Sequence, residues 1–155
     1  MSKLPEAVER FLNAKRIAVV GVSRDSQQAA NNVYRKLRTS GYEVFAVNPQ
    51  ASEVEGDVCY ADLRAIPNKP EAVVIVTHPN VSAQIVRECA ELGITQVWLH
   101  RSFGEGSVSE EAVREGERLG LSCLVGGCPV MYCQPVDLGH RCMQWILNFQ
   151  HRVPS

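Results

Sequence analysis

Short runs of apolar, mostly β-branched residues alternate with segments of helical periodicity along most of this chain. Such alternation is typical of βαβ units and a parallel sheet. Because the runs are almost continuously apolar, helices should cover both faces of the sheet. We predict an α/β fold: a single-domain, Rossmann-like, doubly wound parallel sheet of about five strands with flanking helices. The predicted strands are residues 17–20, 43–47, 72–76, 95–99 and 121–125.

The segments between these strands predict three helices, over residues 31–40, 81–92 and 109–119. Each is followed by a glycine and then by the next strand, which is typical of a helix C-cap. Ser109 before two glutamates supports the third helix start, because an N-cap serine and an acidic first turn both favour a helix N-terminus. Two further helices, 5–14 and 138–150, are expected to flank the sheet.

Size and composition agree with one globular domain. The chain has 155 residues, of which 45% are hydrophobic and 21% charged. These values are ordinary for a protein with a single core. We therefore interpret residues 1–155 as one domain, in which residues 129–155 form a C-terminal helical extension.

The charge balance argues against nucleic acid as a partner, because 16 basic and 17 acidic residues are well mixed along the chain. No stretch approaches the ~18 apolar residues of a membrane helix. Residues 1–16 contain no continuous apolar core of a signal peptide. We expect a cytoplasmic protein that binds a small molecule and no membrane. Its six cysteines are then expected to be reduced thiols.

Polar loops rich in glycine or proline follow the predicted strands. In a doubly wound sheet, ligands bind beyond the carboxyl ends of the strands, where the strand order reverses. Gly21 follows the first strand and would let the backbone approach a phosphate, while the next helix start exposes N–H groups. Ser23 would add a hydroxyl donor. We therefore expect Gly21→Val to abolish nucleotide binding without unfolding the domain.

Two features argue against NAD as the ligand. Ser23 and Asp25 follow Gly21, so the G-x-G-x-x-G fingerprint of dinucleotide-binding loops is missing. The second strand ends at Asn48, where an NAD site would have an aspartate or glutamate for the ribose hydroxyls.

Several segments stand in a characteristic order and spacing: Ile17-Ala18-Val19-Val20-Gly21-Val22-Ser23, then Gly41-Tyr42-Glu43-Val44-Phe45-Ala46-Val47-Asn48-Pro49, then Gly56 with Tyr60, Leu63 and Pro67, and finally Val97-Trp98 and Cys128-Pro129. In this combination the chain resembles the CoA-binding domain family. These are small stand-alone bacterial proteins, similar to the nucleotide-binding domain of the succinyl-CoA synthetase alpha subunit. The resemblance implies a Rossmann-like fold with coenzyme A as cofactor. It implies no reaction, because many such domains have no established catalytic activity.

The loop positions and the resemblance together predict the ligand-binding residues, and no catalytic or metal-binding residue is assigned. The first loop is implied to hold the phosphates, and the loops after the second and third strands to shape the adenosine side. The family often has arginine in the third-strand loop and a basic residue before Cys-Pro, where this chain has histidine and glycine. Arg24, Arg35 or Arg101 would have to compensate. The predicted ligand-binding residues are Gly21, Val22, Ser23, Arg24, Asn48, Pro49, Thr77, His78, Pro79, His100, Cys128 and Pro129.

Three functions stay open at this point. The first is a non-catalytic or regulatory protein that binds CoA or an acyl-CoA. The second is an acyl-CoA-handling enzyme with Cys128 as nucleophile and His78 or His100 as base, although a small buried residue beside Pro129 is the simpler interpretation of that thiol. The third is a metal-binding or redox-sensing protein. Cysteine and histidine are soft ligands that suit zinc or an iron–sulfur cluster, but their spacing here matches no C-x2-C zinc knuckle. Its ligands would come from Cys123, Cys128, Cys133, His140 and Cys142.

The last predicted helix carries apolar residues over a wide arc. Met143, Ile146 and Leu147 form one strip at helical spacing, and Trp145 with Phe149 forms a second. Packing of this helix against the domain's own sheet would bury one strip. The second strip could pack against another subunit, so a homodimer is a possible assembly.

Overall fold

The computed structural model describes residues 5–101 and 106–129. Their main element is a seven-stranded sheet with the order β3-β4-β2-β1-β5-β6-β7. Neighbouring strands are parallel throughout, except for the antiparallel pair β3 and β4. In chain order the elements are α1 (Glu6–Leu12), β1 (Arg16–Val20), α2 (Ala29–Thr39), β2 (Glu43–Val47), β3 (Glu53–Val54), β4 (Asp57–Tyr60), a 3-10 helix (Leu63–Ala65), β5 (Ala72–Ile75), α3 (Pro79–Glu91), β6 (Gln96–Leu99), α4 (Glu110–Arg118) and β7 (Ser122–Val125).

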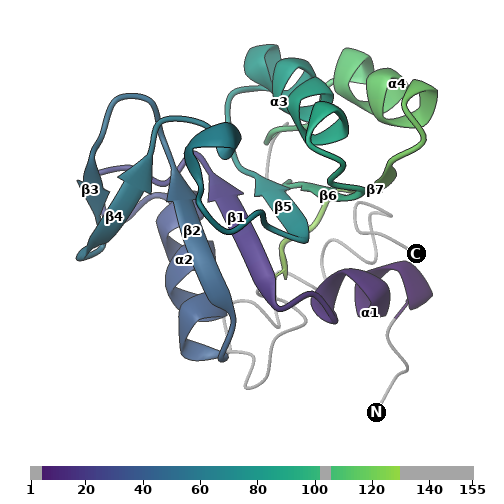
Figure 1. Cartoon of the computed structure of the whole chain (residues 1–155). Coiled ribbons are helices and arrows are strands. Elements are labelled where there is room, and N and C mark those ends of the chain that lie inside the picture. Colours follow the sequence, from purple (N-terminus) through teal and green to yellow (C-terminus); the bar gives the residue numbers. More distant parts are fainter. Residues whose placement is uncertain (1–4, 102–105, 130–155) are drawn as a thin grey trace.

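Helices cover the two faces of the sheet in pairs, as Figure 1 shows. Successive side chains of a strand point to opposite faces, so each central strand supplies two cores. Ile17 and Val19 of β1 pack with α1 and α2, whereas Ala18 and Val20 pack with α3 and α4. This double burial is the reason why the strand sequences lack polar alternation.

Trp98 anchors the core on the side of α1. It is fully buried, and its ring meets that of Phe11 edge-on with 5.3 Å between centroids. Its indole N–H donates to the Gly126 carbonyl at 2.9 Å, so burial leaves no unsatisfied donor on this ring. The N-terminal helix is thereby fixed to a strand more than 80 positions further along the chain.

The predicted fold class is confirmed, and all five predicted strands are present within a residue or two of their expected ends. The count of about five was too low, because β3 and β4 are too short to show a clear apolar pattern. Ser109 caps α4 as expected, since its side chain accepts from the Ala112 N–H. The first predicted helix is shorter, at Glu6–Leu12, and the predicted helix 138–150 lies outside the described residues.

Two helix starts were predicted too late. α2 begins at Ala29 and α3 at Pro79, each two residues earlier than the sequence indicated. Pro79 occupies the first turn of α3, where its missing N–H costs no hydrogen bond, and His78 caps the helix. None of the described helices is long and apolar enough to cross a membrane.

Candidate functional site

A cleft of about 870 Å³ lies at the carboxyl ends of β1, β2, β4 and β5. β1 is the switch point of the sheet, because the chain leaves it for α2 on one face and leaves the adjacent β5 for α3 on the other. The volume is in the range of small-molecule sites, roughly 300–1,000 Å³. The described lining residues are Val20, Gly21, Gln28, Val47, Asn48, Pro49, Gln50, Ala61, Asp62, Leu63, Val76, Thr77, His78, Val81, Gln84, Ile85 and Glu88.

The cleft combines an apolar base with a polar rim. Val20, Val47 and Val76 stand at or just beyond the ends of three neighbouring strands and offer apolar surface. Asparagine, glutamine, threonine, histidine and two carboxylate side chains surround them. Apolar lining with a few convergent polar groups is the usual character of a small-molecule site.

Gly21 is required by the fold itself. Its φ is +110°, and a Cβ at this position would lie 2.1 Å from the Val76 carbonyl oxygen. Any side chain would therefore collide with the backbone that follows β5. This geometry contradicts the expectation that Gly21→Val removes binding while the domain stays folded. The glycine brings β1 and β5 close together at the cleft.

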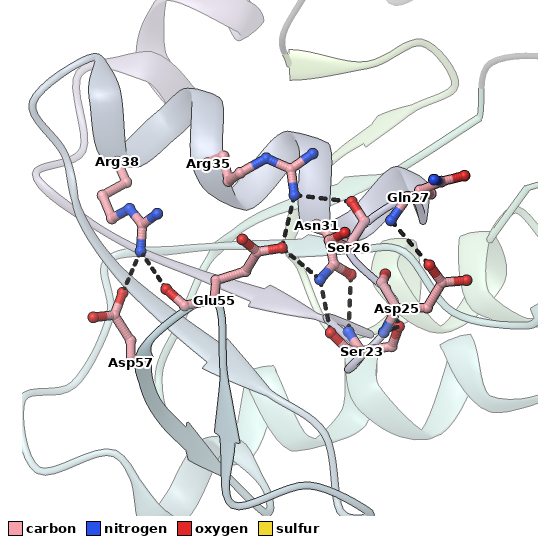
Figure 2. A network of polar contacts seen from close by, with 9 residues as sticks. All are labelled: Ser23, Asp25, Ser26, Gln27, Asn31, Arg35, Arg38, Glu55 and Asp57. Carbon is pink, nitrogen blue, oxygen red and sulfur yellow. Dashed lines mark hydrogen bonds and ion pairs between the residues drawn. The ribbon is translucent and has the colours of Figure 1, made fainter.

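Asn31, on α2, holds the loop that follows Gly21. The Ser23 N–H donates to the Asn31 Oδ1 at 2.9 Å, and the Asn31 amide donates to the Ser23 carbonyl at 2.7 Å. Within the loop, Asp25 accepts from the Gln28 side chain and the Gln27 N–H, both at 3.0 Å. These two hydrogen bonds, the Gln28 bond first, lower the pKa of Asp25. Figure 2 shows the contacts of Asn31 with Ser23 and of Gln27 with Asp25.

Asn48 connects the first and second loops. Its amide nitrogen donates to the Val22 carbonyl at 3.0 Å, and its Oδ1 accepts from the Gln50 N–H at 2.9 Å. Both ends of the side chain are thus engaged within the protein. The residue fixes the relative position of the two loops at the cleft.

The third loop is fixed by the start of α3. The Thr77 N–H donates to the Ser107 hydroxyl at 2.9 Å, and the His78 Nδ1 accepts from the Asn80 N–H at 3.2 Å. Because Nδ1 is an acceptor here, the neutral ring carries its proton on Nε2. The exposed His78 ring therefore brings an N–H donor to the cleft.

One wall of the cleft comes from α3 and was missed by the sequence analysis. Val81, Gln84, Ile85 and Glu88 recur at helical spacing and all line the cleft. Glu88 also accepts from the Leu63 N–H at 3.0 Å, so it ties the helix to the segment that follows β4. The i, i+3, i+4, i+7 spacing was visible in the sequence, but only the tertiary fold shows that this stripe borders a cleft.

Five of the predicted ligand-binding residues line the cleft together: Gly21, Asn48, Pro49, Thr77 and His78. The lining does not include Val22, Ser23, Arg24, Pro79, His100, Cys128 or Pro129. Val22 and Pro129 are buried, and Ser23 and Arg24 belong to the loop after Gly21 that Asn31 holds in place. His100 is 4% exposed. Of the three compensating arginines, Arg35 contacts the same loop, through the Ser26 carbonyl at 2.8 Å.

Cys128 is 3% exposed and packs in the core cluster that contains Phe11 and Trp98. This position gives no support to a nucleophile that faces the cleft. Burial also raises the pKa of the Cys123 thiol to about 11, helped by Glu117, and raises the pKa of Cys89 further. Within residues 5–101 and 106–129, no three potential metal ligands gather. The other members of the proposed cluster, Cys133, His140 and Cys142, lie outside the described residues.

Residues 15–134 match the sequence profile of a family described as "CoA binding domain". The chain belongs to the CoA-binding domain family. The family match covers every strand of the sheet and all of the loops that border the cleft.

Relatives of this CoA-binding domain include both short proteins and parts of larger ones. It is 31% identical over 113 residues to the alpha subunit of ADP-forming acetate–CoA ligase II from Pyrococcus furiosus, a match over 72% of this chain and 24% of that subunit. A hypothetical protein from Pyrococcus horikoshii OT3 has a similar structure, with a TM-score of 0.73, 28% identity and coverage of 83% of this chain and 94% of that one.

A second structural relative is the dinucleotide-forming acetyl-coenzyme A synthetase 1 of Ca. Korarchaeum cryptofilum, solved with phosphate and ADP. Its TM-score is 0.65 at 28% identity, and the match covers 76% of this chain and 26% of that enzyme. The chain thus spans about a quarter of the length of each of these two enzyme chains.

Proposed function

We propose that this chain binds coenzyme A or an acyl-CoA in the cleft at the ends of β1, β2, β4 and β5, as a non-catalytic or regulatory binding protein. The observation that carries the proposal is the position of this cleft. It lies at the switch point of a domain from the CoA-binding family, where doubly wound folds bind nucleotides.

The residues fit the adenosine portion of such a ligand. Val20, Val47 and Ile85 offer apolar surface for a purine ring, and the His78 N–H and the Gln84 amide offer polar contacts at its edge. The first turn of α2 follows the loop and leaves backbone N–H groups without helical partners, which favours phosphate nearby. CoA would supply a thiol that carries an acyl group. The cytoplasmic location and the homodimer expected from the sequence stay predictions.

A pair of valine substitutions tests the site. Val81, on α3, is 44% exposed and lines the cleft, whereas Val58, on β4, is 62% exposed and is not among the lining residues. Val81→Trp should fill the cleft and weaken CoA binding by about tenfold or more, because the ligand would have to displace the indole. Val58→Trp should leave the affinity unchanged, since β-strands accept aromatic residues. Calorimetric titration of the folded variants with CoA measures both.

Two results would contradict the proposal. No heat of binding from the wild-type chain at millimolar CoA would remove the function. An equal loss of affinity in both tryptophan variants would move the site elsewhere. Release of free CoA from acetyl-CoA by the wild-type chain, lost in Cys128→Ser, would favour a thiol-dependent enzyme instead.

A further inference from the structure

Glu55 adopts a conformation that glutamate usually avoids. It is the first residue of the two-residue turn between β3 and β4, and its φ of 54° makes it the one described residue other than glycine with a positive φ in the structure. Turns of this kind favour asparagine, aspartate or glycine at that position. A glutamate there persists where the surroundings hold it in place.

The Glu55 carboxylate is held by two side chains of α2. Its Oε1 accepts from the Asn31 amide at 2.9 Å and from an Arg35 guanidinium N–H at 2.7 Å. The Glu55 side chain is only 11% exposed, and Asn31 is 1% exposed. A largely buried carboxylate with charge-assisted hydrogen bonds fixes the orientation of its donors.

The same two side chains hold the loop after β1. Asn31 forms hydrogen bonds to both the N–H and the carbonyl of Ser23, and Arg35 donates to the Ser26 carbonyl. The two hydrogens of the Asn31 amide are divided between Ser23 and Glu55. Figure 2 shows Asn31 and Arg35, the two side chains that hold the loop, both bonded to the Glu55 carboxylate. This loop runs between Gly21 and Gln28, which line the cleft.

A separate set of contacts docks the β3–β4 hairpin on α2. Arg38 donates to the Glu55 carbonyl at 2.9 Å and to the Asp57 carboxylate at 2.7 Å, and the Tyr34 hydroxyl donates to Asp57 at 2.6 Å. The Glu55 side chain takes no part in these bonds. The hairpin can therefore stay docked when that carboxylate is removed.

We propose that Glu55 is a positioning residue for the loop between Gly21 and Gln28, the two residues through which this loop borders the cleft. It acts through Asn31 and Arg35 and fixes the conformation of residues 23–26 before the ligand arrives. The inference rests on the proposed function, because the bound ligand is taken to be CoA. Preorganisation of this kind raises affinity by lowering the ordering cost of binding.

Glu55→Asn separates positioning from a role in stability. Asparagine tolerates a positive φ and with Gly56 forms the Asn-Gly pair that such turns favour, so the gain in the turn should offset the lost hydrogen bonds and the melting temperature should change little. The shorter side chain cannot keep the hydrogen bonds to α2, so CoA affinity should fall by about tenfold. Glu55→Gln, which keeps an acceptor oxygen, should retain most of the affinity. Asp57→Asn is the matched control, expected to lower the melting temperature without weakening CoA binding by the folded protein.

Amide hydrogen exchange of the ligand-free protein gives a second measurement that needs no CoA. The Ser23 N–H should exchange faster in Glu55→Asn than in the wild type, and at the wild-type rate in Asp57→Asn. Unchanged Ser23 exchange and unchanged CoA affinity in Glu55→Asn would overturn the inference. If the wild type binds no CoA, the proposed function fails, whereas the exchange rates still decide whether Glu55 positions the loop.

Discussion

At the scale of single residues, Gly21 and Asn48 show how much of the cleft is built by backbone constraints. Gly21 has a positive φ and leaves no room for a Cβ against Val76. Asn48 uses both ends of its amide to join two loops. Both residues line the cleft, and both fix backbone segments that border it. Substitutions at either position will therefore disturb the architecture as well as any bound ligand.

Gly21→Ala should destabilise the domain by about 3 kcal/mol or more, because the new Cβ would collide with the Val76 oxygen and the backbone conformation disfavours a side chain. Gly120→Ala is a matched control: its φ is +73°, but nothing lies within 4 Å of its Cβ position. Only backbone strain remains there, about 1 kcal/mol. Urea unfolding of both variants measures the difference. Equal destabilisation would show that the close approach to Val76 is unimportant.

At the scale of elements, α2 is the support for two neighbouring segments. Asn31 and Arg35 contact both the loop after β1 and the Glu55 carboxylate of the hairpin, while Tyr34 and Arg38 contact the hairpin. Residues four apart lie on one side of a helix, so each pair forms its own stripe along α2. Besides covering the sheet, α2 therefore holds two neighbouring segments in place through polar contacts.

The hairpin contact should weaken in acid. The hydrogen bond from Tyr34, followed by that from Arg38, lowers the pKa of Asp57 below its usual 3.8. A carboxylate with a lowered folded pKa contributes stability above its unfolded pKa, and this contribution is lost as pH falls through the folded value. The difference in free energy of unfolding between wild type and Asp57→Asn should be larger at about pH 5 than at about pH 3. Denaturant unfolding at the two pH values measures it, and a constant difference would contradict this account.

At the scale of the whole molecule, the sheet order determines where a ligand can bind. Helices α1 and α2 cover one face, and α3 and α4 cover the other (Figure 1). The two adjacent strands β1 and β5 continue into helices on opposite faces, so a cleft forms beyond their ends. Ligand binding there contacts both halves of the fold and should stabilise it as one unit.

CoA should raise the melting temperature of the domain, whereas NAD at the same concentration should not. A ligand at about 100 times its dissociation constant stabilises the folded state by about 2.7 kcal/mol. NAD lacks its usual ribose partner here, because Asn48 replaces the carboxylate and its amide is engaged by Val22 and Gln50. A thermal-shift comparison decides between the two ligands. Stabilisation by NAD alone would overturn the assignment of CoA.

The sequence by itself determined five of the seven described strands, the three helices between them, the fold class and three of the loops that border the cleft. These features follow from apolar periodicity and from turn residues, and both signals are contained in short stretches of sequence. The short hairpin β3–β4 was missed, because two and four residues carry too little pattern. The earlier starts of α2 and α3 depended on cap geometry that periodicity alone does not show.

Only the tertiary structure decided which side chains from these segments meet. Glu55 reaches Asn31 across 24 positions, and one stripe of α3 borders the cleft. Cys128 follows a strand end, as the cleft residues do, yet it packs into the core beside Trp98. Such contacts depend on how elements pack and on the face to which each side chain points. The packing of elements and the direction of each side chain arise from the whole fold. Local sequence favours a strand or a helix but does not determine which other elements it packs against.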